Sequence, residues 1–190
     1  MTAIINYLNS FGILSEDHVH LVGDHFSTLQ MSRNQFYLKE GEVCKTLGFV
    51  ESGLLMYYKV AENGQEQVSD FAQENEWVSQ YQSFTSRTPA NIFIKAIEPS
   101  VVHTITLESL NKLYSEIPDF EKLGKQLMEK SFMEMVNKHL QFQNLGAEER
   151  YEKMIELYPS LMQRVPQYYI ASYLGIAPPS LSRIRKNKSN

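Results

Sequence analysis

Cysteine is almost absent from this sequence, since Cys44 is the only one among 190 residues. One thiol cannot form a disulfide within the chain, and it cannot supply a zinc knuckle or a four-thiolate iron–sulfur cluster. We therefore predict no cofactor or metal bound through cysteine. The default location for such a chain is a reducing compartment, the cytoplasm.

Long apolar runs are also missing. No uncharged apolar stretch approaches the roughly 18 residues that a membrane-spanning helix needs. The N-terminus lacks the basic segment followed by an apolar run that marks a signal peptide. We expect a soluble protein that is not exported and has no membrane partner.

Residues with the chemistry of an active site are sparse. The segment 31–107 contains a single histidine, His103, and no cluster of carboxylates or thiols completes a metal site around His18 and His25. Neither a Ser/His/Asp arrangement nor a glycine-rich phosphate loop is evident. We predict that the chain is not an enzyme and has no catalytic or metal-binding residues.

Acidic residues are missing from the C-terminal end, because no Asp or Glu follows Glu156. The whole chain has 18 basic and 22 acidic residues and a net charge of -4, so this tail carries +5 and the remainder -9 (-4 minus 5). Such asymmetry is typical of an acidic body joined to a nucleic-acid-binding end. The basic residues of the tail are Arg164, Arg183, Arg185, Lys186 and Lys188.

Residues 167–186 have the pattern of two short helices joined by a glycine turn. Gly175 supplies the positive φ that ends the first helix, and Pro178 suits the first turn of the second. This pattern predicts a helix-turn-helix, with a solvated basic tail on an ordinary helical hairpin as the alternative. The apolar residues that would close its core are Ile170, Ala171, Leu174, Leu181 and Ile184.

The polar and basic side chains of this segment are candidates for contact with DNA. Arg183 has the geometry to pair with a guanine edge, whereas Arg185 and Lys186 suit phosphates near the end of the helix. The predicted DNA-binding residues are Tyr169, Ser180, Ser182, Arg183, Arg185 and Lys186.

Upstream, the periodicity changes twice. Apolar spacings of three and four predict two short helices over 4–29, whereas period-two alternation predicts an antiparallel roll or sandwich over 31–107. Asn63–Gly64 indicates a hairpin with a type I′ turn. Helical periodicity returns over 107–114, 119–145 and 148–161.

The segment 119–145 is apolar over too wide an arc for a helix that packs on one side only. A second copy of the chain is the simplest partner, and the alternative is a core helix between two domains of one chain. The predicted dimer-interface residues are Leu127, Met128, Phe132, Met135, His139 and Phe142.

Several motifs in this order resemble the Crp/Fnr family of bacterial transcription regulators over nearly the whole chain. They are Gly41–Glu42, Val50–Gly53, Asn63–Glu66, Tyr169–Ile176 and Leu181–Arg185. The resemblance implies an α+β protein with an antiparallel, cyclic-nucleotide-binding-like β-roll (a double-stranded β-helix), a long dimerisation helix and a C-terminal helix-turn-helix. Its implied domains are 1–117, 118–145 and 146–190, and its implied partners are a second copy, a palindromic promoter site and RNA polymerase.

Two departures from the family pattern limit what the resemblance implies. In the family, a Gly-Glu pair binds the ribose of cyclic AMP and an Arg-Ser pair binds its phosphate. By resemblance these pairs fall on Ser79–Gln80 and Ala90–Asn91, so the carboxylate and the guanidinium are both missing. In the family, the second helix of the motif reads the DNA bases and begins with polar residues, whereas here Ala177–Pro179 stands at its start. The DNA half-site that the family recognises therefore cannot be assigned to this chain. Candidate residues for an unidentified small-molecule effector are Ser79, Gln80, Tyr81, Arg87 and Asn91.

We therefore predict a homodimeric, sequence-specific DNA-binding regulator that does not respond to cyclic AMP. The alternative is a small-molecule-binding signalling module whose helical tail contacts protein rather than DNA. The effector, the operator and the direction of regulation stay open at this point.

Overall fold

The computed structural model describes residues 2–12, 16–143 and 145–188. The chain forms two compact units, the first from residues up to 57 together with 71–130, and the second from 58–70 together with residues from 131 onward. The division into domains 1–117, 118–145 and 146–190 stays a prediction. No helix in the described part of the chain is both long enough and apolar enough to cross a membrane.

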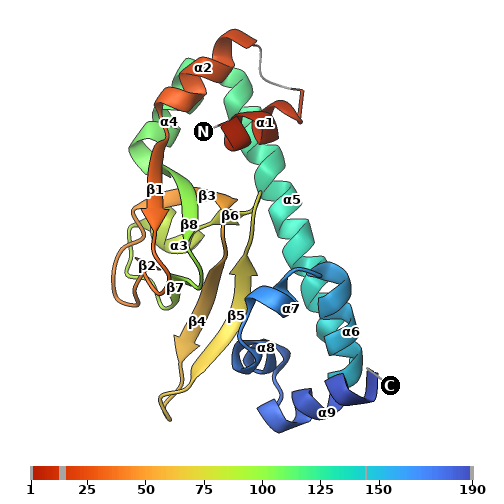
Figure 1. Cartoon of the computed structure of the whole chain (residues 1–190). Coiled ribbons are helices and arrows are strands. Elements are labelled where there is room, and N and C mark those ends of the chain that lie inside the picture. The colour runs from red at the N-terminus through yellow and green to blue at the C-terminus, as the bar shows by residue number, and fades with distance from the viewer. Residues whose placement is uncertain (1, 13–15, 144, 189–190) are drawn as a thin grey trace. The chain divides into compact units, whose positions relative to one another are not determined.

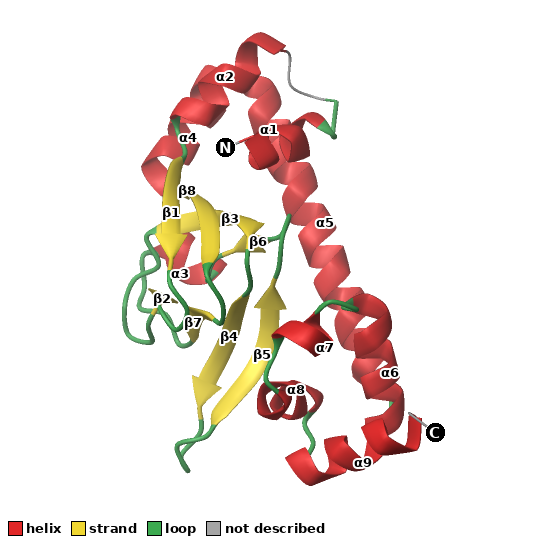
Figure 2. Cartoon of the chain, viewed as in Figure 1, coloured by secondary structure: helices red, strands yellow, loops and turns green. Residues whose placement is uncertain are grey.

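Two antiparallel sheets form the β-roll, as the alternating sequence pattern predicts (Figures 1 and 2). Their strand orders are β1-β8-β3-β6 and β2-β7-β4-β5. The strands are β1 Ser27–Met31, β2 Phe36–Leu38, β3 Thr46–Ser52, β4 Leu55–Val60, β5 Glu66–Ala72, β6 Trp77–Val78, β7 Phe93–Ala96 and β8 Ser100–Thr106.

The helices lie before, within and after the roll. Those of the N-terminal part and the roll are α1 Thr2–Asn9, α2 Glu16–Asp24, α3 Tyr81–Ser86 and α4 Leu107–Glu116. Those that follow are α5 Pro118–Gln143, α6 Ala147–Leu157, α7 Leu161–Arg164, α8 Gln167–Leu174 and α9 Pro178–Lys188.

The expected second helix is shorter than predicted. It ends at Asp24, and the residues that follow form β1, which pairs antiparallel with β8 so that Leu29 lies opposite Val102. Phe26 and Leu29 are three apart and therefore imitate helical spacing, but the segment 27–31 also alternates between the two faces of a strand. Pairing with a distant strand decides between the two patterns. The predicted helix over 148–161 also ends early, at Leu157.

The Asn63–Gly64 hairpin is confirmed, but its turn type is not. Gly64 has a φ of 80°, and Asn63 is not among the described residues with positive φ, so a type I′ turn is excluded. The amide of Gly64 donates to the carbonyl of Ala61 (2.8 Å), and that of Ala61 donates to the carbonyl of Gln65 (2.9 Å). These bonds indicate a type I turn followed by a glycine in the left-handed region, the usual form of a three-residue hairpin loop.

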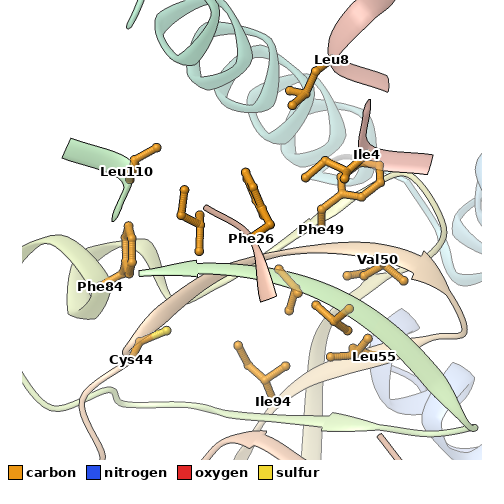
Figure 3. Packing of buried hydrophobic residues seen from close by; sticks show 14 of the residues in the cluster. Ile4, Leu8, Phe26, Cys44, Phe49, Val50, Leu55, Phe84, Ile94 and Leu110 are labelled. Atoms are coloured by element: carbon orange, nitrogen blue, oxygen red, sulfur yellow. The ribbon is translucent and has the colours of Figure 1, made fainter. Parts of the chain in front are cut away.

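Apolar side chains fill the interior of the first unit. Figure 3 shows Ile4 and Leu8 of α1, Phe84 of α3 and Leu110 of α4 gathered with strand residues in one cluster. Fully buried strand residues include Phe49, Val50, Leu55, Ile94, Val102 and Ile105. Burial of this kind is the main stabilising contribution to the roll.

One titratable side chain lies within this apolar interior. His103 of β8 is fully buried, and its Nδ1 lies 3.1 Å from Oγ1 of Thr28 on β1. Its Nε2 is hydrogen-bonded to the carboxylate of Glu51 on β3. The imidazole therefore links three neighbouring strands of one sheet, and we assign it a structural role because both ring nitrogens are used.

We expect His103→Ala to lower the free energy of unfolding by about 2 kcal/mol, because it opens a cavity and removes a polar partner from Thr28 and Glu51. The midpoint of urea unfolding measures this change. His25→Ala is the matched control, because His25 is only partly buried and lies 3.7 Å from Glu116, and its loss should cost about 0.5 kcal/mol. Equal effects of the two substitutions would contradict the structural role of His103.

Candidate nucleic-acid interface

The turn between α8 and α9 has the geometry that the glycine position predicts. Gly175 adopts φ 68° and ψ 32°, in the left-handed region. Its amide donates to the carbonyl of Ser172 (3.0 Å), and the amide of Ile176 donates to that of Ala171 (3.0 Å). These two bonds end α8 and turn the chain toward α9.

The helix-turn-helix has a closed apolar core. α8 contacts both α6 and α9, so α6 is the third helix that the two-helix motif needs. Ile184 of α9 is half-buried, which leaves it at the margin of this core. The fully buried side chains are Met154, Leu161, Ile170, Ala171, Leu174 and Leu181.

The opposite face of α9 is polar and basic. Arg183, Lys186 and Ser182 are exposed, while Ser180 and Arg185 are half-buried. No carboxylate lies anywhere in the sequence after Glu156, so no acidic side chain of α8 or α9 reduces this positive charge. The structure therefore brings five of the six predicted DNA-binding residues onto one helix with a cationic surface.

The first turn of α9 offers few backbone donors. Pro178 and Pro179 have no N–H group, and the amides of Ser180 and Leu181 both donate to the carbonyl of Ala177, at 2.9 and 3.2 Å. Contacts with a polar ligand must therefore come from side chains further along the helix. The hydroxyl of Ser182 donates to the carbonyl of Pro178 (3.2 Å), so this side chain lies back along the helix.

The burial of Tyr169 does not favour its predicted contact with DNA. Its side chain is only 7% exposed, whereas the neighbouring Tyr168 is 57% exposed. Burial, a hydrogen bond with Tyr168 and the nearby Glu66 carboxylate all raise the pKa of Tyr169 well above its usual range. Contacts within the protein therefore occupy Tyr169, and its contact with DNA stays a prediction.

α5 carries an exposed apolar stripe. Met128 is 41% exposed, Phe132 58% and Met135 60%, and the three lie one and two turns apart on the same face. Leu127 is half-buried. The side chains of His139 and Phe142 lie outside the described residues, so only four of the six predicted interface positions have described side chains. An exposed row of large apolar residues on one helix marks a surface suited to a partner.

Four of the five candidate effector residues, Ser79, Gln80, Tyr81 and Arg87, lie in α3 or directly beside it. Gln80 caps this helix, since its side-chain oxygen accepts the amide hydrogen of Ser83. The hydroxyl of Ser79 donates to the carbonyl of Thr46 (3.3 Å). Arg87 ends the helix in the left-handed region, with its guanidinium 5.9 Å from the centre of the Phe84 ring. Tyr81 and Asn91 are exposed. The groups of Ser79 and Gln80 therefore serve the fold, and ligand binding by this cluster stays a prediction.

The chain is similar in sequence to a known domain family and to known regulatory proteins. Residues 28–116 match the cyclic nucleotide-binding domain family. The chain is 27% identical over 165 residues to the fumarate nitrate reduction regulatory protein of Klebsiella oxytoca. That match covers 81% of this chain and 65% of the relative, so the chain spans about 65% of the length of the curated relatives it matches.

Two solved structures show the same fold at low sequence identity. FixK2 from Bradyrhizobium japonicum has a TM-score of 0.70 and 16% identity, covering 85% of this chain and 83% of that one. A protein from Eubacterium rectale described as a Crp/Fnr-family transcriptional regulator has a TM-score of 0.69 and 16% identity, covering 96% and 87%. The chain is similar to Crp/Fnr regulators in fold, and its sequence is similar to that of the fumarate nitrate reduction regulators. The predicted β-roll and helical C-terminal region are confirmed by this likeness.

The cyclic-nucleotide-binding-like domain lacks charged side chains at the two positions where the resemblance places them. Position 80 carries the carboxamide of Gln80, which caps α3, in place of a carboxylate. Position 90 carries the buried methyl group of Ala90, whose amide donates to the carbonyl of Glu42 (2.8 Å). Neither residue supplies the charge-assisted hydrogen bonds that a cyclic phosphate diester requires.

The sequence predicts neither a metal site nor enzymatic activity. Within the described ranges, no group of three or more His, Cys, Asp or Glu side chains is placed to hold a metal ion. The curated relatives are regulatory proteins, in agreement with the prediction that the chain is not an enzyme.

Proposed function

We propose that this chain is a homodimeric, sequence-specific DNA-binding transcription regulator of the Crp/Fnr type. The observation that carries the proposal is α9, a helix anchored through Leu181 with Arg183 and Lys186 exposed on its other face. In a helix-turn-helix, such a helix enters the major groove while the preceding helix crosses the backbone. The second copy bound through the α5 stripe supplies the second reading helix, so the DNA site is an inverted repeat.

The charge distribution supports DNA as the partner of α9. The chain is acidic as a whole, and a protein with such a charge would be repelled by a polyanion unless its basic groups were concentrated. They are concentrated in the last part of the chain, beyond Glu156. We place this regulator in the cytoplasm, with RNA polymerase as a further partner on the DNA.

The regulator does not respond to cyclic AMP in this proposal. The side chains at Gln80 and Ala90 carry no formal charge, so a cyclic phosphate would lose its hydration without gaining a charged partner. Any effector of the roll is then a different small molecule, for which Tyr81, Arg87 and Asn91 remain the exposed candidate residues.

The test begins with selection of DNA from a random pool by the full chain. An inverted repeat should emerge, and its affinity should fall steeply as salt increases because phosphate contacts release counterions. Lys186→Ala should lower the affinity for every sequence by a similar factor and reduce the slope of log affinity against log salt by about one per subunit. Fluorescence anisotropy of labelled duplexes over a salt series measures both quantities.

The control is Lys112→Ala, which removes the same charge from an exposed position on α4 and should leave the slope unchanged. A chain that enriches no sequence and protects no DNA at low salt would overturn the proposal. That outcome would favour the signalling module whose helical tail contacts protein.

A further inference from the structure

The β4–β5 hairpin and the helix-turn-helix belong to the same compact unit. The outer part of the hairpin, residues 58–70, groups with residues from 131 onward and not with the remainder of the roll. Figure 1 shows α8 beside this hairpin. The outer part of the hairpin therefore lies next to the motif that we propose to read DNA. The residues that join the hairpin to this motif have no role in the function described so far.

A serine of α8 makes the first connection. The hydroxyl of Ser172 accepts the amide hydrogen of Val68 (2.9 Å) and donates to the carbonyl of Glu66 (2.9 Å). β5 is the edge strand of its sheet, and residues 66 and 68 direct their backbone groups to the same open side. One hydroxyl therefore satisfies a donor and an acceptor that an edge strand otherwise leaves to solvent.

A carboxylate makes the second connection. Glu66 lies beside the hydroxyls of Tyr58, on β4, and Tyr169, on α8. Burial, followed by the charge and hydrogen bond of Glu66, raises the pKa of Tyr58 to about 12, so this phenol stays protonated and donates to the carboxylate. Both tyrosines are buried. The side chain of Glu66 thus joins the two elements a second time, a few residues from the Ser172 contact.

The two connections lie on the face of α8 that does not pack into the core of the helix-turn-helix. Tyr169 and Ser172 are three residues apart on one face, and the buried core residues Ile170, Ala171 and Leu174 lie on the other. α8 is therefore held on both sides, by α6 and α9 through apolar packing and by the hairpin through hydrogen bonds.

We propose that Ser172 and Glu66 are positioning residues that fix the helix-turn-helix to the β4–β5 hairpin and so set the spacing at which the two reading helices of a dimer meet DNA. The inference rests on the proposed function. The unit that contains these residues also contains the part of α5 with Phe132 and Met135. Residues that hold α8 within this unit therefore hold α9 at a defined distance from the two-fold axis.

The first arm of the experiment needs no DNA. Amide hydrogen exchange of the full chain should show the Val68 amide protected in the wild-type protein, and about tenfold faster exchange in Ser172→Ala. Ser172→Thr retains a hydroxyl and should restore protection. Ser160→Ala removes an exposed serine of the same unit and should change nothing at Val68. An unprotected Val68 amide in the wild-type protein would overturn the contact.

The second arm measures affinity for the selected inverted repeat and for repeats lengthened or shortened by one base pair. Ser172→Ala and Glu66→Gln should reduce the preference for the selected spacing by about fivefold, and Ser172→Thr should restore it. A purely structural role would lower affinity equally at every spacing, and that result would overturn the positioning role. Failure of the proposed function has a different signature, since Val68 would be protected while the wild-type protein bound no repeat of any spacing.

Discussion

A protein carrying both Phe132→Glu and Met135→Glu should be monomeric, and its affinity for an inverted repeat should fall by about two orders of magnitude or more. The wild-type side chains are 58% and 60% exposed on α5, so a second copy is what covers them in our proposal. Burying a Phe or Met side chain contributes about 1.5–3 kcal/mol, and two-fold symmetry doubles each contribution. The variant instead brings four carboxylates together in a desolvated interface, which is strongly unfavourable.

Sedimentation equilibrium measures the dimer, and anisotropy with a two-half-site duplex measures the loss of affinity. The fold of each subunit should be retained, because both side chains are exposed in the single chain, and circular dichroism checks this. Gln126→Glu is the matched control: it adds a carboxylate to α5 at an exposed position away from the stripe of Met128, Phe132 and Met135. A variant that remains dimeric would show that the copies associate through another surface.

The C-terminal motif is the part that sequence reasoning described best, because its signals are local. Gly175 with Leu174 and Ile176 defines the end of one helix through backbone geometry that only a few residues share. The spacing of apolar residues then places the core. Both signals act within about ten residues, so they can be read from the sequence without knowledge of any distant contact.

The parts that sequence reasoning described less well depend mostly on distant contacts. β1 imitates a helix until Leu29 is paired with Val102, which lies more than seventy positions further on. The sequence makes Tyr169 a candidate DNA-binding residue, and only the structure places the side chain of Glu66 beside it. α3 carries no helical pattern, and its ends are defined by the Gln80 cap and by Arg87 in the left-handed region. Contacts between segments that are distant along the chain decided the first two cases, and they cannot be read from periodicity. The ends of α3 are instead defined by local caps.

Arg183→Ala should lose discrimination at one base pair in each half-site while retaining much of its affinity for other sequences. The guanidinium is exposed on the face of α9 opposite Leu181, where a bidentate pair with the major-groove edge of a guanine is geometrically available. One such pair discriminates against the wrong base by about 1–3 kcal/mol, which corresponds to roughly a tenfold to hundredfold change in affinity per half-site. Two half-sites in a dimer make the total effect larger than that of any single phosphate contact.

The measurement is a set of duplexes in which each position of the half-site is changed in turn, titrated with wild-type protein, Arg183→Ala, Arg183→Lys and Lys186→Ala. Arg183→Lys should not restore discrimination, because a lysine keeps the charge but lacks the planar pair of donors. Lys186→Ala should lower all affinities alike, because a phosphate contact carries no sequence information. If Arg183→Ala also lowered every affinity by the same factor, Arg183 would be a phosphate contact, and the bases would have to be read by Ser180 and its neighbours beyond the two prolines.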